Sequence, residues 1–411
     1  MGHYSYDVVI VGASIAGCTA ATLLGRAGLR VALIEKQKSK EAYKKLCTHF
    51  IQASAVPTMD RLGISEQIEA AGGLRTGSTI WIPYGDHWLK PYAEDGRYPH
   101  YGYNIRREKL DIIVREVAMM TKGVDFFFGH SAKDLLEENG KFTAVITAEQ
   151  ATKQTHLFNG RLIVAADGHY SKLAELSQAK TKRWKNGRFG YFAYYKNMPL
   201  KRKNLAQIWF LDPDAAYAFP CDNGVTLLAV MPTIDQLPAF KQNIEGNLIR
   251  RMKALPEGPD MARGERISPI YGMLKGEFHY RQPTLPGLAF MGDAAASTDP
   301  LWGCGGGWAF QSAEWLADCT REALVTNQGL ENALKQYEQT HKQKLRGHNL
   351  YNATFGNGRK FWPHERITFA AATKNKSCAQ HIHQYASRHT SVGRLYSPVN
   401  FVRSVWVNAF G

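Results

Sequence analysis

The chain begins with two apolar runs that enclose a helical pattern. Asp7 is followed by Val-Val-Ile-Val, an Ala- and Leu-rich segment comes next, and Leu29–Ile34 returns to a largely apolar run that ends at Glu35. Short apolar runs of this kind are typical of strands that are buried on both faces of a parallel sheet. The pattern therefore predicts a βαβ unit at the start of the chain.

Later in the chain, apolar and aromatic runs alternate with polar turns. From Gly190 to Pro232 the runs are short and bounded by Pro, Asp or Asn-Gly, which is typical of antiparallel strands.

The tail beyond residue 326 is expected to be helical to about Gly347 and irregular after it. Helices are also expected over Ala53–Leu62 (ending at Gly63), Arg106–Ala118, Lys241–Leu255 and Trp308–Leu324. The expected strands are Thr79–Pro83, a small meander of Val124–Phe128, Leu135–Leu136, Phe142–Thr147 and Thr155–Phe158, a separate strand Leu162–Ala166, the aromatic strands Tyr191–Tyr195, Leu205–Leu211, Ala215–Pro220 and Val225–Met231, and Leu288–Met291.

The order of these elements predicts a discontinuous nucleotide-binding fold. Buried strands at 162–166 and 288–291 resemble those of the N-terminal unit, and the aromatic strands lie between them in the sequence. We therefore expect an α/β, Rossmann-like domain interrupted by an inserted antiparallel-sheet substrate domain. The nucleotide-binding domain is expected to comprise 1–75, 100–187 and 285–325, the sheet domain 76–99 and 188–284, and a C-terminal region 326–411.

Composition narrows the class of protein and its surroundings. The chain of 411 residues has no long uncharged apolar stretch, so stable membrane insertion is not expected. The N-terminal apolar segment is the first strand rather than a cleaved leader, so residence in the cytoplasm is expected. Six scattered cysteines lack a zinc-binding spacing, and the pair His381 and His383 has no acidic neighbour to complete a ligand set. No metal site is therefore expected.

The charge balance is strongly basic. There are 51 Lys and Arg against 36 Asp and Glu, a formal net charge of +15. The basic clusters are dispersed and accompany no nucleic-acid-binding motif, so no nucleic-acid partner is expected. A positive field instead favours cofactor phosphates or an anionic small-molecule substrate.

The N-terminal unit carries the pattern of a dinucleotide site. Gly12 permits a tight turn, Gly17 allows close packing of helix against strand, and the free amides at the helix start face a pyrophosphate. Ser14 replaces the second glycine of the usual pattern, and Glu35 stands where a carboxylate accepts hydrogen bonds from a ribose. The candidate residues of this part are Gly12, Ser14, Ile15, Ala16, Gly17, Glu35 and Lys36.

Two further motifs make the resemblance specific. One is Asp167-Gly168 directly after the strand 162–166, and the other runs from Gly292-Asp293 through Pro300 to a glycine-rich loop. In this order and spacing, the three elements resemble the group A flavoprotein monooxygenase superfamily of the para-hydroxybenzoate hydroxylase type. That superfamily is usually grouped with geranylgeranyl reductases and flavin-dependent halogenases.

The resemblance implies a bound FAD and a set of residues around it. Asp293 would accept a hydrogen bond from the ribityl chain, and the loop amides would approach the flavin pyrimidine edge. Arg107 would open a helix and reach the FAD phosphates, and the loop with Cys47 and His49 would approach the flavin. His49 is a candidate for orienting a substrate or relaying a proton, and a hydrogen-bonded structural histidine is an equal alternative. The further residues implied are Asp167, Gly292, Pro300, Gly303, Gly305, Gly306 and Gly307.

The resemblance also implies a reaction. NADH or NADPH would reduce the flavin, O2 would be trapped as a flavin C4a-hydroperoxide, and an aromatic or polycyclic molecule would be hydroxylated or epoxidised. The pocket must exclude water, and the aromatic strands offer walls for it. Strand alternation places Phe192 and Tyr194 on one face and Tyr191 and Tyr195 on the other. The candidate lining residues are Phe192, Tyr194, Trp209 and Phe219.

Three other functions stay open. Asp299-Pro300-Leu301 favours a reductase of isoprenoid double bonds, since it resembles the reductase and halogenase branches. A halogenase needs a positioned lysine and a Trp-x-Trp-x-Ile-Pro element, of which Trp81–Pro83 is only a fragment in another part of the chain. A flavin-binding partner protein without turnover is the fourth reading, and no residue pattern favours it.

Overall fold

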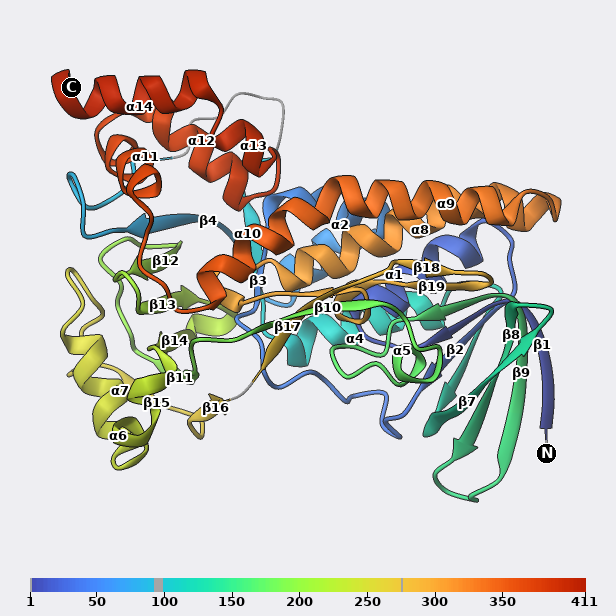
Figure 1. The fold of residues 1–411 in the computed structure, drawn as a ribbon. Coiled ribbons are helices and arrows are strands. Elements are labelled where there is room, and N and C mark those ends of the chain that lie inside the picture. Colours follow the sequence, from blue (N-terminus) through green and yellow to red (C-terminus); the bar gives the residue numbers. More distant parts are fainter. Residues whose placement is uncertain (1, 92–98, 275) are drawn as a thin grey trace.

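The computed structural model describes residues 2–91, 99–274 and 276–411. Two large sheets occupy the two ends of an elongated body, and helices α8 and α9 run along one long side of it (Figure 1). A part of the predicted range 76–99, residues 92–98, lies outside the described residues. The bounds of the two long helices are α8 Gly305–Thr326 and α9 Leu330–His341.

The first sheet has the parallel core that the apolar runs predict. Its strand order is β18-β19-β9-β1-β2-β6, and Val8 on β1 pairs in parallel with Val31 on one side and Leu162 on the other. Helices α1, α4 and α8 bury the apolar side chains of one face. This arrangement confirms the Rossmann-like α/β class. The bounds are β1 Gly2–Val11, α1 Ile15–Arg26, β2 Val31–Glu35, α4 Arg107–Met119, β6 Val124–Phe128, β9 Thr155–Ala165, β18 Thr284–Leu285 and β19 Leu288–Phe290.

The meander beside this sheet differs from the prediction in two ways. Val124–Phe128 pairs with β2 and is part of the main sheet, and the predicted strands 155–158 and 162–166 form one continuous strand. The intervening Gly160 does not end the strand, since a Cβ there would lie 2.9 Å from Cγ2 of Val9 and its absence permits close packing on β1. The meander strands are β7 His130–Glu138 and β8 Lys141–Glu149, both antiparallel to their neighbours, and the short helix α5 Lys172–Leu176 lies nearby.

The second sheet has nine strands and is largely antiparallel, as predicted. The exception is the parallel pairing of β12 with β4, in which Ile208 lies opposite Ile80. Helices α6 and α7 cover one face of it. The strands are β3 Phe50–Ile51, β4 Leu74–Trp81, β5 Gly102–Asn104, β11 Gly190–Lys196, β12 Leu205–Phe210, β13 Ala215–Pro220, β14 Thr226–Met231, β15 Glu265–Arg266 and β16 Tyr271–Met273, with α6 Leu237–Lys241 and α7 Ile244–Lys253.

Smaller elements join the two sheets. The predicted helix over Ala53–Leu62 consists of a 3₁₀ turn at Ala53–Ala55 and α2 Val56–Leu62, and it ends at Gly63 with φ 75°. A three-stranded sheet is formed by β10 Thr181–Lys185, β17 Glu277–Arg281 and β20 Ala296–Ser297, and α3 spans Ser65–Ala70.

The expectation of an irregular tail beyond Gly347 is wrong. Five helices follow, and Asn375, Ser391 and Ser397 cap three of them by accepting hydrogen bonds from first-turn amides. Apolar side chains of these helices pack on the second sheet, as Phe369 does on Phe210. The helices are α10 Gly347–Gly356, α11 Pro363–Lys374, α12 Lys376–Ala386, α13 Val392–Leu395 and α14 Pro398–Phe410.

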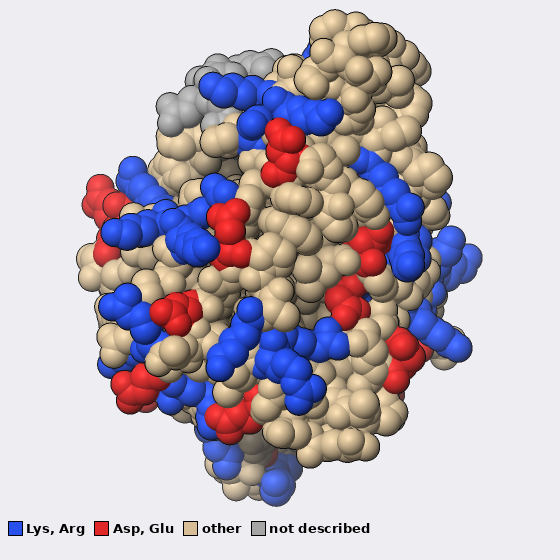
Figure 2. All heavy atoms as spheres, turned by 90° about the vertical axis from the view of Figure 1, so that its left-hand side faces the viewer, with Lys and Arg blue, Asp and Glu red and all other residues tan. Residues whose placement is uncertain are grey.

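The surface is basic but mixed. Figure 2 shows Lys and Arg side chains scattered over one end of the molecule, with Asp and Glu among them. Among the described residues, no helix combines the length and the apolar character that a membrane crossing requires.

Candidate cofactor and active site

The three glycine motifs, distant in sequence, come together at the carboxyl end of the parallel sheet. A Cβ on Gly12 would lie 2.4 Å from the carbonyl oxygen of Ala166, so the first turn packs directly on the Asp167 segment. A Cβ on Gly292 would lie 3.1 Å from Cβ of Ala16, so the third motif packs on the start of α1. Ligands of open α/β sheets bind at this edge. The predicted cofactor residues therefore share one region.

Two helix starts face this region without a side-chain cap. Neither Ser14 before α1 nor Cys304 before α8 accepts a hydrogen bond from the first turn of its helix, and neither first turn holds an acidic residue. Uncapped first-turn amides are free to bind negatively charged groups. A Cβ on Gly305 would meet only Asp293 Oδ1, at 3.8 Å, which leaves open space before α8. These features fit an extended cofactor with a diphosphate at one end and an electron-rich ring edge at the other.

Arg107 and Arg106 point to different partners. Arg107 begins α4, is buried, and donates through Nη2 to Ser14 Oγ at 2.7 Å and through Nε to Asp111 Oδ1 at 2.6 Å. Arg106 instead binds Asp222, with Nη2 2.8 Å from Oδ2. Of these two arginines, Arg107 is therefore the one that reaches the start of α1, where a diphosphate is expected.

Two acidic side chains hold the backbone around the site. Glu35 accepts hydrogen bonds from the amides of Ala13 and Gln37, both at 2.8 Å, and Lys36 next to it is exposed. Asp167 accepts from the amide of Lys172 at 2.7 Å through Oδ2, while its Oδ1 is buried without a hydrogen-bond partner among the described residues. Burial raises the pKa of Asp167. This unpaired oxygen is a free acceptor beside the Gly12 turn.

Lys44 and Asp293 form an ion pair across the region. Lys44 Nζ lies 2.8 Å from Asp293 Oδ2. Although burial opposes the charged form of Asp293, Lys44 outweighs it and lowers the pKa of this carboxyl. A negatively charged Asp293 is a hydrogen-bond acceptor, as its predicted contact with the ribityl chain requires.

The glycine-rich loop packs on the segment that follows His49. A Cβ on Gly303 would lie 3.1 Å from Phe50, one on Gly306 2.5 Å from Ile51, and one on Gly307 3.4 Å from Gln52. Pro300 and Gly303 shape the turn into the loop, and Gly303 has φ 59°, which a residue with a side chain rarely adopts. The loop and the His49 segment therefore form one wall.

His49 is buried and bonded on both ring nitrogens. The backbone amide of Arg107 donates to Nδ1 at 3.1 Å, and Nε2 lies 2.5 Å from the hydroxyl of Tyr194. His49 also has φ 65°, an uncommon backbone conformation for a residue other than glycine. The side chain of His49 thus connects the segment around Cys47 and His49, called the cofactor loop below, with Tyr194 on β11 of the second sheet.

The Cys47 thiol lies next to His49, whose backbone amide donates to its sulfur at 3.3 Å. Burial by itself would raise the pKa of the Cys47 thiol, but hydrogen bonding to His49 and the positive charges of Arg107 and Lys44 outweigh it and lower the pKa to about 6. Arg107 Nη1 lies 3.9 Å from the sulfur. A thiolate is therefore the main form at neutral pH.

The predicted lining residues divide between two faces of the second sheet. Phe192, Tyr194 and Phe219 lie on the face toward the glycine-rich loop, where Phe219 packs on Phe50. The prediction for Trp209 is wrong: it lies on the opposite face, against Trp88, and its Nε1 donates to the carbonyl of Pro256. Its indole is part of the core beneath α6 and α7.

Two residues of this region were not predicted. Lys44 lies in a basic run directly after Glu35, and such a run beside a phosphate site is the signal that was available. Gln52 donates to the carbonyl of Trp302 at 3.3 Å and also to that of Ala386, so it connects the loop to the C-terminal helices. No local pattern marks a glutamine for this position.

Comparison with known proteins identifies the family. The model of a family described as an FAD binding domain matches residues 5–228, and the chain belongs to this family. Tryptophan 2-halogenase of Chondromyces crocatus is 24% identical over 388 residues, which cover 88% of this chain and 71% of the relative. Digeranylgeranylglycerophospholipid reductase of Thermoplasma acidophilum is 24% identical over 373 residues, 85% of this chain and 86% of the relative.

A solved structure agrees over almost the whole length. PqsL of Pseudomonas aeruginosa, named as a probable FAD-dependent monooxygenase, has a TM-score of 0.69 at 19% identity and covers 94% of this chain and 100% of its own. This likeness shows that the fold agrees, and the family match confirms the predicted resemblance to the group A flavoprotein superfamily. The chain is an FAD-dependent oxidoreductase of this superfamily. The two relatives reported above are named as a halogenase and a reductase.

Proposed function

We propose that the protein is an FAD-dependent monooxygenase that takes electrons from NADH or NADPH. It would transfer one oxygen atom of O2 to an aromatic or polycyclic small molecule, by hydroxylation or epoxidation. The observation that carries this proposal is the hydrogen-bonded pair of His49 and Tyr194, which joins the cofactor loop to the aromatic face. The pair supplies the proton handling that oxygen transfer to an electron-rich ring requires.

The direction of the hydrogen bonds follows from the donors. A backbone amide can only donate, so Nδ1 of His49 accepts from Arg107 and carries no proton. The proton of the neutral ring then lies on Nε2, which donates to the Tyr194 oxygen. Burial raises the pKa of Tyr194, with smaller contributions from Cys221 and Cys47, so the phenol keeps its own proton. Tyr194 therefore has a hydroxyl proton available for a further acceptor.

The aromatic face of the second sheet, which carries Phe192, Tyr194 and Phe219, and the hydroxyl of Tyr194 together determine which substrates fit. When bound, FAD would accept two electrons from the nicotinamide and would use them to activate O2. The half-buried Phe192 offers apolar ring contacts, the fully buried Phe219 behind it helps to exclude water, and Tyr194 offers one hydrogen bond to a hydroxyl or carbonyl oxygen of the substrate. These groups favour a flat molecule with one polar substituent.

The test uses flavin-loaded protein and labelled oxygen. Oxidation of NADH and of NADPH is followed with a panel of phenols, indoles and polycyclic substrates, and products are analysed by mass spectrometry after reaction under ¹⁸O2. The proposal expects substrate-stimulated oxidation with one labelled atom in the product. Turnover that leaves the label out of every product would overturn it, and parallel runs with bromide or chloride show whether a halogen is added instead.

A reductase of isoprenoid double bonds is the second candidate. The Asp299-Pro300-Leu301 turn favours it, and in the structure Asp299 is fully buried, accepting from the amide of Leu301 at 2.7 Å with Arg188 3.6 Å from its other oxygen. The relative named as a digeranylgeranylglycerophospholipid reductase aligns over most of both chains. Such an enzyme would turn over without O2 and add two hydrogen atoms to a polyprenyl substrate, so the anaerobic arm of the same assay separates the two candidates.

A further inference from the structure

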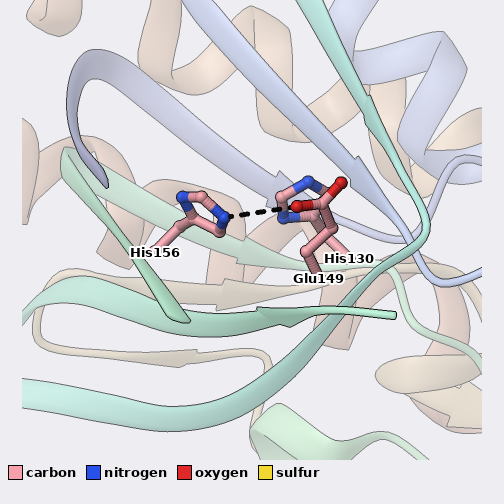
Figure 3. A group of neighbouring side chains, drawn as sticks. All are labelled: His130, Glu149 and His156. Carbon is pink, nitrogen blue, oxygen red and sulfur yellow. Dashed lines mark ion pairs between the residues drawn. The ribbon is translucent and has the colours of Figure 1, made fainter. Parts of the chain in front are cut away.

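Three side chains with metal-binding atoms gather on the meander, at the far end of the first sheet from the cofactor region. His130 on β7 lies directly opposite Glu149 on β8, and His156 on β9 lies opposite Thr147. Thr147 and Glu149 are two residues apart on one strand, so they point to the same face. The register of three strands therefore places His130, Glu149 and His156 on one face, as Figure 3 shows.

The three groups are close together and incompletely bonded. One ligand atom from each residue lies within 4.8 Å of the others, and His156 Nε2 is 3.7 Å from Glu149 Oε2. His156 is 9% exposed, and neither of its ring nitrogens has a hydrogen-bond partner among the described residues. A Cβ on Gly2 would lie 2.7 Å from its Nδ1, so this nitrogen is turned toward β1, and Nε2 is the atom that faces the cluster.

We propose that His130, Glu149 and His156 bind a divalent transition-metal ion, with zinc as the preferred ion. Two imidazoles and one carboxylate are a ligand set that zinc accepts, with a water in the fourth position. Tetrahedral ligand atoms around zinc lie roughly 3.3–3.5 Å apart, so the cluster closes by a movement of about 1 Å. Glu149 is half-exposed and supplies that movement.

The neighbouring side chains complete the site. Thr147 Oγ1 lies 3.3 Å from Nδ1 of His130, which leaves Nε2 of that ring to the metal. Thr152 Oγ1 donates to Glu149 Oε2 at 2.6 Å. Partners of this kind orient metal ligands in known sites. They act here before any metal is bound.

The location indicates a structural metal. His156 pairs with Gly2 at one end of β1, whereas Gly12 follows the other end of this ten-residue strand. Ten strand residues span roughly 30 Å, so the metal lies far from the flavin region. The ion would bind β7, β8 and β9 together and stabilise the sheet, independently of the proposed reaction.

The test is zinc binding by flavin-loaded protein that has first been treated with a chelator. Calorimetric titration with zinc sulfate is expected to give one site per chain, and zinc is expected to raise the melting temperature. Glu149→Gln and His156→Asn are each expected to weaken zinc binding at least tenfold and to abolish the rise in melting temperature. Cobalt added in place of zinc should show visible absorption bands that Glu149→Gln loses.

The matched control is His3→Gln, which removes an exposed histidine from the adjacent strand β1. It should bind zinc as the unmodified chain does, and the flavin absorption spectrum should be the same with and without zinc. The proposal is overturned if the unmodified chain binds no zinc at micromolar concentration, or if Glu149→Gln binds zinc as tightly as the unmodified chain. If His156→Asn does not fold, Glu149→Gln decides the question, since its side chain is half-exposed.

Discussion

Nε2 of His49 and the hydroxyl of Tyr194 lie 2.5 Å apart, and this contact links two segments that are 145 residues apart in the sequence. His49 follows the N-terminal βαβ unit, and Tyr194 lies on β11 of the second sheet. A short hydrogen bond between the buried His49 and the half-buried Tyr194 also restrains the orientation of both rings. The pair therefore adds to the contact between Phe50 and Phe219 in holding the segment around His49 against the second sheet.

Tyr194→Phe should lower the free energy of unfolding by about 1 kcal/mol, because it leaves the Nε2 proton of buried His49 without an acceptor. The measurement is denaturant unfolding of the flavin-loaded protein. Tyr271→Phe is the control, since its ring lies 6.1 Å from that of Tyr194 and its hydroxyl does not contact His49. A double-mutant cycle with His49→Asn isolates the pair, and asparagine tolerates the positive φ at this position. A coupling energy near zero would contradict the link.

Arg107→Lys should weaken FAD binding about tenfold, or about 1.4 kcal/mol, because lysine lacks the planar fork that reaches the start of α1. Fluorescence titration of the chain with FAD gives the dissociation constant. Arg106→Lys is the matched control, because Arg106 binds Asp222 instead. It should lower stability while FAD affinity changes by less than about twofold. Equal losses of affinity in both variants would show that Arg107 has no special role.

The Cys47 thiol should react with iodoacetamide at a rate that rises through pH 6 and is nearly constant at pH 8, since its pKa is about 6. Cys319 is also partly exposed, but burial raises its pKa, so its rate should still be rising above pH 9.0. Peptide mass spectrometry measures both rates in one sample. Parallel pH profiles for the two thiols would contradict the structure.

The same lowered pKa affects stability. The ordinary thiol pKa of 9.0 applies in the unfolded chain, so the unfolded state binds the Cys47 proton more tightly than the folded state does. The stabilisation is complete above pH 9.0 and is lost as the pH falls to about 6. The difference in unfolding free energy between the unmodified chain and Cys47→Ser should therefore grow from pH 6 to pH 9.0. A difference that stays constant over this range would exclude a lowered pKa.

Gly17→Ala should destabilise the protein by about 3 kcal/mol and impair FAD binding, since overpacked contacts carry costs of this size. The added Cβ would lie 1.7 Å from the carbonyl oxygen of Gly12 and would force α1 away from β1. Gly347→Ala, in α10, is the control: its Cβ would meet nothing within 4 Å, and alanine favours helix by about 0.5–1 kcal/mol. Thermal unfolding should therefore shift in opposite directions for the two variants.

Several features of the fold could be predicted because they depend on local sequence. The apolar run before Gly12, the helix after it and the acid at Glu35 lie within one short segment, so the βαβ unit follows from their spacing alone. The strand Ala215–Pro220 and the stop at Gly63 were predicted for the same reason. The irregular tail was a wrong prediction because short helices held by single Asn and Ser caps give a weak periodic pattern.

The sequence by itself determined the cofactor fold, its glycine turns and the alternation of side chains within each strand, because these are set by neighbours along the chain. Only the tertiary structure decided which strands lie side by side and in what register. The pairing of Trp209 with Ala216 placed that indole away from Tyr194, and the pairing of His130 with Glu149 created a cluster that no spacing reveals. Such contacts depend on the packing of distant segments, and that information is spread over the whole chain.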